Sequence, residues 1–278
     1  MDPVSPRQAE ILDRARRTGR VDVDSLADEF SVTPQTIRKD LNDLCERGML
    51  QRVHGGAVLP SGIANYAYDA RRQIASDEKR LIGDRTAALV PDNASIMLNI
   101  GTTTEQVARA LRQHDGIMAI TNNINVANIL RTAPAVEVII AGGQVRASDG
   151  GIVGEATVDF IRQFKVDYAV IGASAIDTDG TIFDYDFREV RVSREILSHA
   201  RQVLLVADSM KFQRSAPVRI AHISEIDIFV TDKAPPASVV EICREHGVRI
   251  EVCDAIPGCD MRTVRLRGGA GPIADAEA

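Results

Sequence analysis

The sequence predicts an α/β protein in two parts: an N-terminal winged helix-turn-helix over residues 1–59 and a mostly parallel α/β domain over residues 79–254. Three helical patterns followed by a hairpin with a Gly-Gly turn predict the first part. Seven short apolar segments that alternate with amphipathic helical patterns predict the second. A chain of 278 residues is long enough to form one small core and one larger core.

The first two helices of the N-terminal part follow from apolar spacing and capping residues. Apolar side chains share one face over residues 11–15, in a helix that ends near Gly19. A second, short helix is predicted over SLADEF, residues 25–30, with Asp24 or Ser25 as its N-cap.

A third helix and a hairpin complete the predicted winged helix-turn-helix. Thr33 is the expected N-cap, and Pro34 occupies the first helical position, where its fixed φ suits a helix. The helix continues to Gly48, and the apolar spacing within it predicts a buried stripe of Ile37, Leu41 and Leu44. After Gly48, the pattern MLQRVHGGAVLP predicts a strand, a Gly-Gly turn and a second strand.

The third helix presents polar side chains that lie off its buried stripe. Such a helix can enter the major groove, where Arg pairs with guanine, Gln pairs with adenine, and Thr contacts thymine methyl groups or phosphates. The expected DNA contacts are Thr33, Gln35, Thr36, Arg38 and Lys39, with Arg52 and His54 of the hairpin at phosphates or the minor groove. The net charge of −6 does not oppose this, because DNA binding needs local positive charge. The alternatives are a merely solvated helix face and a winged helix that binds protein.

Composition limits the remaining segments and the class of protein. Residues 60–78 have no clear periodicity and predict a linker, and residues 255–278, rich in Gly, Ala and Pro, predict a flexible tail. No apolar stretch approaches the ~20 residues of a membrane span, and the N-terminus has no apolar signal-peptide region, so we expect a cytoplasmic protein. The four cysteines lack zinc-site spacing, so we expect neither metal nor cofactor.

The larger domain is predicted to contain a mostly parallel sheet covered by helices on both faces. The helical patterns between its strands include residues 105–111, 126–133, 187–200 and 238–246. The predicted strands are residues 95–100, 116–121, 136–142, 166–173, 202–208, 227–231 and 248–253.

A phosphate site is predicted where the first of these strands runs into a helix. The turn consists of Gly101, Thr102, Thr103 and Thr104. Glycine allows close approach to a ligand, the free N–H groups of a helix N-terminus attract anions, and hydroxyls add donors without charge. Open α/β sheets bind ligands at this end of their strands. The alternative is that Gly and Thr serve only the turn and the cap; the absence of a Walker pattern argues against a nucleoside triphosphate.

Three further loops follow strands and are expected at the same edge. Asn side chains can bond hydroxyls or phosphate, an Arg after a Gly-Gly pair can hold an anion, and a Lys can add a point charge. The candidates are Asn122 and Asn123, then Gly142, Gly143 and Arg146, then Asp208 and Lys211. The alternatives are a turn, a bend and a surface ion pair, respectively.

Acidic residues cluster at the start of a later predicted helix. They include Asp184, Asp186 and Glu189, with Arg188 among them. Acids at a helix N-terminus complement the helix dipole, so a structural role is favoured. Contact with ligand hydroxyls is the alternative.

The stretch SVTPQTIRKDLNDLCERGMLQRVHGGAV, residues 31–58, resembles the signature of the deoxyribose-operon-repressor (DeoR) family of bacterial regulators. Thr33 stands where the family usually has Ser, which keeps the capping hydroxyl. The resemblance covers about residues 5–254 and continues through EKRLIGDRTAALV, NIGTTTEQVARAL, TNNINVAN, AGGQVR, DGGIVGEATVDFI and ADSMKF.

The resemblance implies a sensor domain related to ribose-5-phosphate isomerase, an assembly of two or four chains, and operator DNA as partner. It also implies a repressor of glycerol and glycerol-3-phosphate catabolism genes that is released from DNA by glycerol 3-phosphate. A repressor that responds to another phosphorylated sugar is the alternative.

An enzyme and a scaffold are the alternatives to a regulator. The resemblance of the larger domain to an isomerase makes a phosphosugar isomerase-like enzyme one alternative. Two features argue against it: Asn99 stands where many family members have Asp, and an enzyme has no use for a DNA-binding domain. A scaffold is disfavoured because the polar loops cluster at strand ends. We therefore expect no enzymatic activity.

Overall fold

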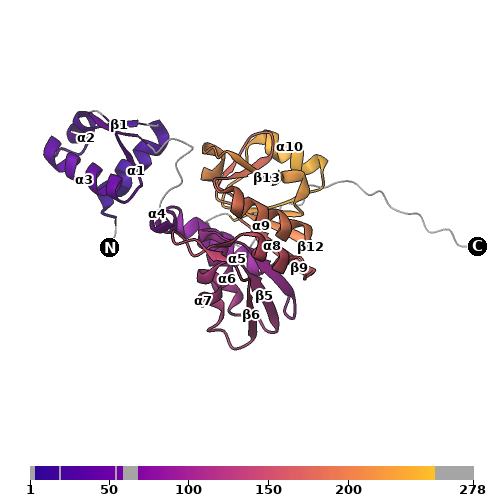
Figure 1. Ribbon diagram of the computed structural model, residues 1–278. Coiled ribbons are helices and arrows are strands. Elements are labelled where there is room, and N and C mark those ends of the chain that lie inside the picture. Colours follow the sequence, from indigo (N-terminus) through magenta and orange to yellow (C-terminus); the bar gives the residue numbers. More distant parts are fainter. Residues whose placement is uncertain (1–3, 19, 54, 59–67, 254–278) are drawn as a thin grey trace, which may run out of the picture.

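The computed structural model describes residues 4–18, 20–53, 55–58 and 68–253, and Figure 1 shows the small N-terminal domain beside the larger sensor domain. The predicted tail, residues 255–278, and residues 60–67 of the predicted linker lie outside the described residues. No helix in the described part of the chain is long and apolar enough to span a membrane.

The N-terminal domain is a winged helix-turn-helix, which confirms the prediction. Its three-stranded antiparallel sheet has the order β1-β3-β2. Helix α3 begins as predicted, since the Thr33 side chain accepts a hydrogen bond from the Thr36 backbone and Pro34 occupies the first turn. The elements are α1 (Pro6–Thr18), β1 (Arg20–Asp22), α2 (Val23–Glu29), α3 (Pro34–Glu46), β2 (Gln51–Val53) and β3 (Gly56–Val58).

One apolar cluster holds this domain together. The predicted stripe of α3, Ile37, Leu41 and Leu44, is fully buried against Ile11 of α1 and Leu26 of α2. Burial of these side chains fixes the angle between the helices, so the polar face of α3 is left toward solvent.

Two helices occupy the range 68–87, which differs from the predicted linker over residues 60–78. Helix α4 spans Tyr68–Gln73 and α5 spans Ser76–Ala87, with Ala75 between them at φ +53°. Helix α4 has no apolar stripe that periodicity could reveal. It is held by polar contacts with residues distant in the chain: Tyr68 contacts Glu105 of α6, and Arg71 contacts Asp149 in a loop.

The sensor domain is built on a seven-stranded sheet of order β15-β14-β12-β9-β4-β5-β6, in which every neighbouring pair is parallel. This confirms the mostly parallel α/β prediction, and each strand falls within or close to its predicted range. The strands are β4 (Ser95–Leu98), β5 (Ile117–Thr121), β6 (Val136–Ile140), β9 (Val166–Ile171), β12 (Ala200–Val206), β14 (Ile228–Thr231) and β15 (Arg249–Val252).

Helices cover both faces of this sheet, as Figure 1 shows. Residues of α5, α6 and α7 form an apolar cluster with one face, and residues of α8, α9 and α10 form a cluster with the other. The helices are α6 (Thr102–Leu111), α7 (Ile124–Leu130), α8 (Glu155–Ile161), α9 (Phe187–Ser198) and α10 (Ala237–Glu245), with 3-10 turns η1 (Ser209–Gln213) and η2 (Ile223–Glu225).

In the described part of the larger domain, five short strands that the sequence did not predict lie outside the main sheet. They form a three-stranded antiparallel sheet of order β10-β11-β13 and a two-stranded one, β7-β8. Their bounds are β7 (Gln144–Val145), β8 (Ile152–Val153), β10 (Ala175–Ile176), β11 (Thr181–Asp184) and β13 (Val218–His222). Most contain too few residues to show a period of two.

The direction of chain growth reverses between β4 and β9. After β4, the chain adds β5 and then β6 on one side; it then returns to place β9, β12, β14 and β15 on the other. The loops that follow β4 and β9 therefore diverge and leave room at the carboxyl edge of the sheet. This topology puts the candidate ligand site at that edge.

Replacing Phe229 of β14 with Ala should lower the free energy of unfolding by about 3–5 kcal/mol, because this fully buried ring packs against Phe212. Urea denaturation monitored by circular dichroism measures the loss. Phe187→Ala is the matched control, since Phe187 is 63% exposed and its loss should change stability by no more than ~0.5 kcal/mol. Equal effects of the two substitutions would contradict the assigned core.

Candidate effector site and DNA-binding surface

The turn after β4, which is the predicted phosphate cradle, lies at the N-terminus of α6. Gly101 has φ +152°, which L-residues rarely adopt. Asn99 sets the approach to this turn: its Oδ1 accepts from the Ile100 backbone N–H at 2.7 Å, and its Nδ2 donates to Ser193 Oγ at 2.6 Å. All three Thr side chains that follow are buried, and the buried Thr104 Oγ1 has no hydrogen-bond partner among the described residues.

The loop after β5 lies beside this cradle, since β4 and β5 are neighbouring strands. Asn122 and Asn123 are fully buried. Asn122 Nδ2 donates to the Ile152 carbonyl at 3.1 Å, and Asn123 Oδ1 caps α7 by accepting from the Asn125 backbone at 2.7 Å. Their other polar atoms, Asn122 Oδ1 and Asn123 Nδ2, have no partner in the described part of the chain.

Three buried polar atoms without partners on adjacent strand ends indicate a ligand site. Such groups are rare in native proteins because each loses its hydrogen bonds to water. Thr104 Oγ1 and Asn123 Nδ2 can donate to a phosphate or a hydroxyl, whereas Asn122 Oδ1 can accept only from a donor such as a hydroxyl. The unpartnered set therefore matches a ligand that carries both acceptors and hydroxyl groups.

Two buried lysines supply positive charge near this edge of the sheet. Lys211 of η1 was predicted, whereas Lys79 of α5 was not, because a lone Lys in a helical pattern predicts an exposed side chain. Burial lowers the pKa of Lys211 to about 7 and that of Lys79 to about 8, although the Asp208 carboxylate opposes both shifts. Burial alone raises the pKa of Asp208, but the charges of Lys211 and then Lys79 outweigh it and hold that pKa below its ordinary value.

Arg71 of α4 is a second functional candidate that the sequence did not reveal. One of its terminal nitrogens donates to Asp149 Oδ2 at 3.2 Å, and its buried Nε has no partner among the described residues. Its charge also acts on Lys211, Lys79 and Asp184, which places all four groups in one electrostatic neighbourhood. The segment that contains Arg71 showed no periodicity, so only its tertiary contacts identify it.

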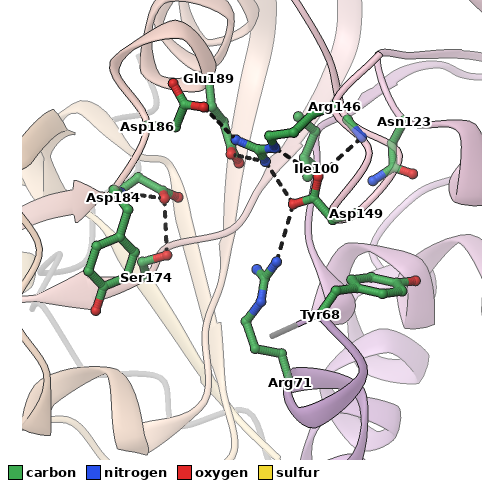
Figure 2. A network of polar contacts seen from close by, with 12 residues as sticks. Tyr68, Arg71, Ile100, Asn123, Arg146, Asp149, Ser174, Asp184, Asp186 and Glu189 are labelled. Carbon is green, nitrogen blue, oxygen red and sulfur yellow. Dashed lines mark hydrogen bonds and ion pairs between the residues drawn. The ribbon is translucent and has the colours of Figure 1, made fainter. Parts of the chain in front are cut away.

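Arg146 has a different environment from the one predicted for an anion-binding residue. Figure 2 shows its guanidinium among three carboxylates: Asp149 at 2.7 and 2.8 Å, Asp186 at 3.0 Å and Glu189 at 2.5 Å. Burial disfavours its charge, but the bonds to Asp149 and Glu189 outweigh that effect and raise the pKa of Arg146. A guanidinium already paired with three carboxylates is a poor partner for another anion, so its geometry favours a structural role.

The glycines before Arg146 are also explained by packing. The Gly142 carbonyl accepts a hydrogen bond from Thr157 Oγ1 at 2.9 Å. Gly143 has φ +150°, and a Cβ there would lie 2.2 Å from the same Thr157 oxygen. The Gly-Gly pair therefore allows close contact with Thr157 of α8, which favours a packing role.

The acidic cluster predicted as helix-dipole partners contains two unusual carboxyls. Burial, and then the neighbouring Asp184, raises the pKa of Glu189 to about 8. Burial likewise raises the pKa of Asp184, whose Oδ1 accepts from Ser174 Oγ at 3.1 Å and from the Tyr185 backbone at 2.6 Å. Asp186 has the predicted structural role, because it caps α9 by accepting from the Arg188 backbone.

The predicted DNA-binding residues lie together on the first turns of α3. Thr33, Gln35, Arg38 and Lys39 are exposed and Thr36 is half-buried. Thr33 and Thr36 hydroxyls are 2.9 Å apart, and Arg38 lies 3.5 Å from Gln35 Oε1. On the hairpin, the exposed Arg52 donates to the Gly56 carbonyl at 3.2 Å, whereas His54 lies outside the described residues.

A winged helix-turn-helix with an exposed polar recognition helix, joined to an α/β domain with a polar ligand site, defines a DNA-binding regulator with a sensor domain. The chain belongs to the DeoR family of transcriptional regulators. Residues 7–62 match the DeoR-like helix-turn-helix domain, and residues 74–233 match the DeoR C-terminal sensor domain.

The similar proteins include repressors matched over nearly their whole length. The glycerol-3-phosphate regulon repressor of Escherichia coli K12 is 42% identical over 247 residues, which cover 89% of this chain and 98% of that protein. The Haemophilus influenzae protein of the same name is 42% identical, covering 90% and 97%. Among solved structures, ribose 5-phosphate isomerase A of Methanocaldococcus jannaschii is 14% identical with a TM-score of 0.37, covering 50% of this chain and 55% of that one.

Glu189→Gln should remove a pH-dependent loss of stability. The native pKa of Glu189, about 8, exceeds its ordinary value of 4.5, so its stabilising contribution is complete below pH 4.5 and is lost as the pH rises through 8. The variant should therefore gain stability relative to the native protein between pH 5 and pH 8. Urea denaturation at both pH values measures the change.

The exposed Glu155 of α8 provides the control, because Glu155→Gln should show no such pH-dependent gain. A stability difference between Glu189→Gln and the native protein that stays constant with pH would contradict the assigned carboxyl environment.

Proposed function

We propose that this protein represses genes of glycerol and glycerol-3-phosphate catabolism by binding operator DNA, and that glycerol 3-phosphate releases it. The observation that supports this most is the 42% identity to two glycerol-3-phosphate regulon repressors over about nine-tenths of the chain. The exposed face of α3 and the unpartnered polar atoms at the sheet edge fit the two binding functions that such a repressor needs.

In this proposal the phosphate binds at the N-terminus of α6. The free N–H groups of the first turn and the helix dipole attract an anion, and Thr104 adds a hydroxyl donor. Lys211 and Lys79 provide cations, and an incoming dianion favours the protonated form of both. The glycerol hydroxyls are left for Asn122 and Asn123.

Release from DNA follows from a difference in affinity between two states. The ligand shifts the population only if it binds more tightly to the state whose DNA-binding domains are misaligned. We propose an assembly of two or four chains, in which paired domains hold two half-sites in the cytoplasm. The sensor domain binds its ligand without catalysis in this proposal, in keeping with the repressor function that the relatives' names state.

The test is to measure operator affinity with and without glycerol 3-phosphate for the native protein and for Lys211→Met. Glycerol 3-phosphate should weaken operator binding by the native protein, with fructose 1-phosphate and glycerol as comparisons. Lys211→Met keeps the side-chain volume but loses the charge, so it should hold DNA and lose most of its response. Calorimetric titration should show at least about tenfold weaker ligand binding, as expected for a lost charge-assisted contact.

Lys233→Met is the control, because Lys233 is exposed after β14 and should respond like the native protein. A response to fructose 1-phosphate alone would support the sister repressor of a sugar phosphate. A Lys211→Met protein that releases DNA normally would remove Lys211 from the site.

Arg38→Ala should separate the two binding functions. Loss of one side chain that contacts a base costs about 1–3 kcal/mol, so operator affinity should fall by about five- to 150-fold. Ligand affinity, measured by calorimetry, should not change, because Arg38 lies on α3 of the other domain. Arg14→Ala, which removes a half-buried arginine of α1 that pairs with Glu29, is the control for loss of a positive charge elsewhere in this domain. Loss of both activities in Arg38→Ala would argue against separable domains.

A further inference from the structure

Helix α4 connects the two functions in the chain, because it is the first described element after the N-terminal domain. It also contacts the ligand edge of the sensor domain. Figure 2 shows Tyr68 and Arg71 on this helix, with Arg71 directed at Asp149. The proposed function assigns no role to α4 or to Tyr68.

The Tyr68 hydroxyl joins the first turns of two helices at the candidate site. It donates to Glu105 Oε1 at 2.5 Å, and it accepts from Asn125 Nδ2 at 2.9 Å. Glu105 is the neighbour of Thr104 in the first turn of α6, and Asn125 lies in the first turn of α7. Burial, and then the bond to Glu105, raises the pKa of Tyr68, so its hydroxyl keeps the proton that it donates.

The backbone at the end of α4 also accepts hydrogen bonds, from the Lys79 side chain of α5. Lys79 Nζ donates to the carbonyls of Arg71 at 2.5 Å and Ile74 at 2.7 Å. The Asn125 amide that bonds Tyr68 also donates to the Asp149 carbonyl at 2.9 Å, and the Asp149 side chain binds Arg71. Helix α4 therefore has hydrogen bonds to α5, α6, α7 and the loop that contains Asp149, and one of these partners, Glu105, is the chain neighbour of Thr104 at the proposed phosphate position.

A bound phosphate repels the acidic partner of α4 and attracts the two cations that bind this helix or belong to it. It adds negative charge close to the largely buried Glu105, which accepts the Tyr68 hydroxyl, and like charges in a poorly solvated site repel. It attracts Lys79 and Arg71, the cations that hold or belong to α4. The same ligand thus disturbs the hydrogen bond at the start of the helix and both cationic contacts farther along it.

We propose that the Tyr68 contact with Glu105 and Asn125 couples effector binding to DNA release. With α4 docked through Tyr68, the N-terminal domains are held in the operator-binding arrangement. The effector phosphate weakens this docking and frees the domains to move. The inference rests on the proposed function, and it assigns to Tyr68 a coupling role rather than contact with the ligand.

The experiment uses full-length Tyr68→Phe, which keeps the ring and removes the hydroxyl. An operator fragment selected by the native protein from a random-sequence pool serves as DNA, and glycerol 3-phosphate serves as effector. The variant should bind operator at least about fivefold more weakly without effector, within the usual range of coupling between two sites. Since coupling is reciprocal, it should bind glycerol 3-phosphate at least as tightly as the native protein.

Weaker operator binding together with undiminished effector binding distinguishes a coupling role from a structural defect, because a structural defect weakens the binding of both ligands. Tyr168→Phe is the matched control: it removes a hydroxyl from β9, away from α4, and should leave both affinities unchanged. Glu105→Gln is the second variant. Replacing the charged acceptor with a neutral one should weaken operator binding in the same direction.

Three results separate the possible failures. If the native protein responds to effector and Tyr68→Phe keeps both native affinities, the coupling role is wrong while the proposed function stands. Loss of both affinities with a lowered melting temperature likewise overturns the coupling role. If glycerol 3-phosphate does not change operator binding by the native protein, the proposed function itself fails, and the coupling fails with it.

Discussion

The parallel sheet of the sensor domain places every strand's carboxyl end at one edge, and the rest of the structure depends on this constraint. Segments far apart in the chain, after β4, β5, β9 and β12, are brought together there. The reversal of strand order between β4 and β9 keeps their loops from covering the same space. The cradle of α6, the two asparagines after β5 and the lysine of η1 can therefore share one ligand.

Several charged side chains of the site are buried away from water, and this burial carries a free-energy cost. Arg146 balances Asp149, Asp186 and Glu189, which would otherwise be costly to bury together. Burial lowers the pKa values of Lys79 and Lys211 well below the ordinary lysine value, and the Asp208 carboxylate only partly offsets this effect. In the proposed function, a dianionic ligand supplies the missing charge and so offsets part of the free-energy cost of burying these lysines. The same electrostatic balance reaches α4 through Arg71 and Lys79, which connects the ligand site with the segment that leads to the DNA-binding domain.

The sequence predictions that succeeded rest on local signals, although the N-cap of α2 is Asp22 rather than the predicted Asp24 or Ser25. The Thr33 cap, Pro34 and the apolar stripe of α3 lie within a few residues of one another, and the structure forms that helix as predicted. The seven sheet strands are apolar segments flanked by turns, and buried parallel strands need little else. The Gly101 turn was also predictable, because a glycine between a strand and a helix often marks a positive φ, which other residues rarely adopt.

Sequence by itself determined the two-part organisation, the strands of the sheet and the loops at its carboxyl edge. Only the tertiary structure decided which charged side chains meet there. It surrounds Arg146 with carboxylates from as far as Glu189, buries Lys79, and brings Arg71 of an unpredicted helix to Asp149. The physical reason is that periodicity and capping are set by neighbours in the chain, whereas burial and ion pairing are set by neighbours in space.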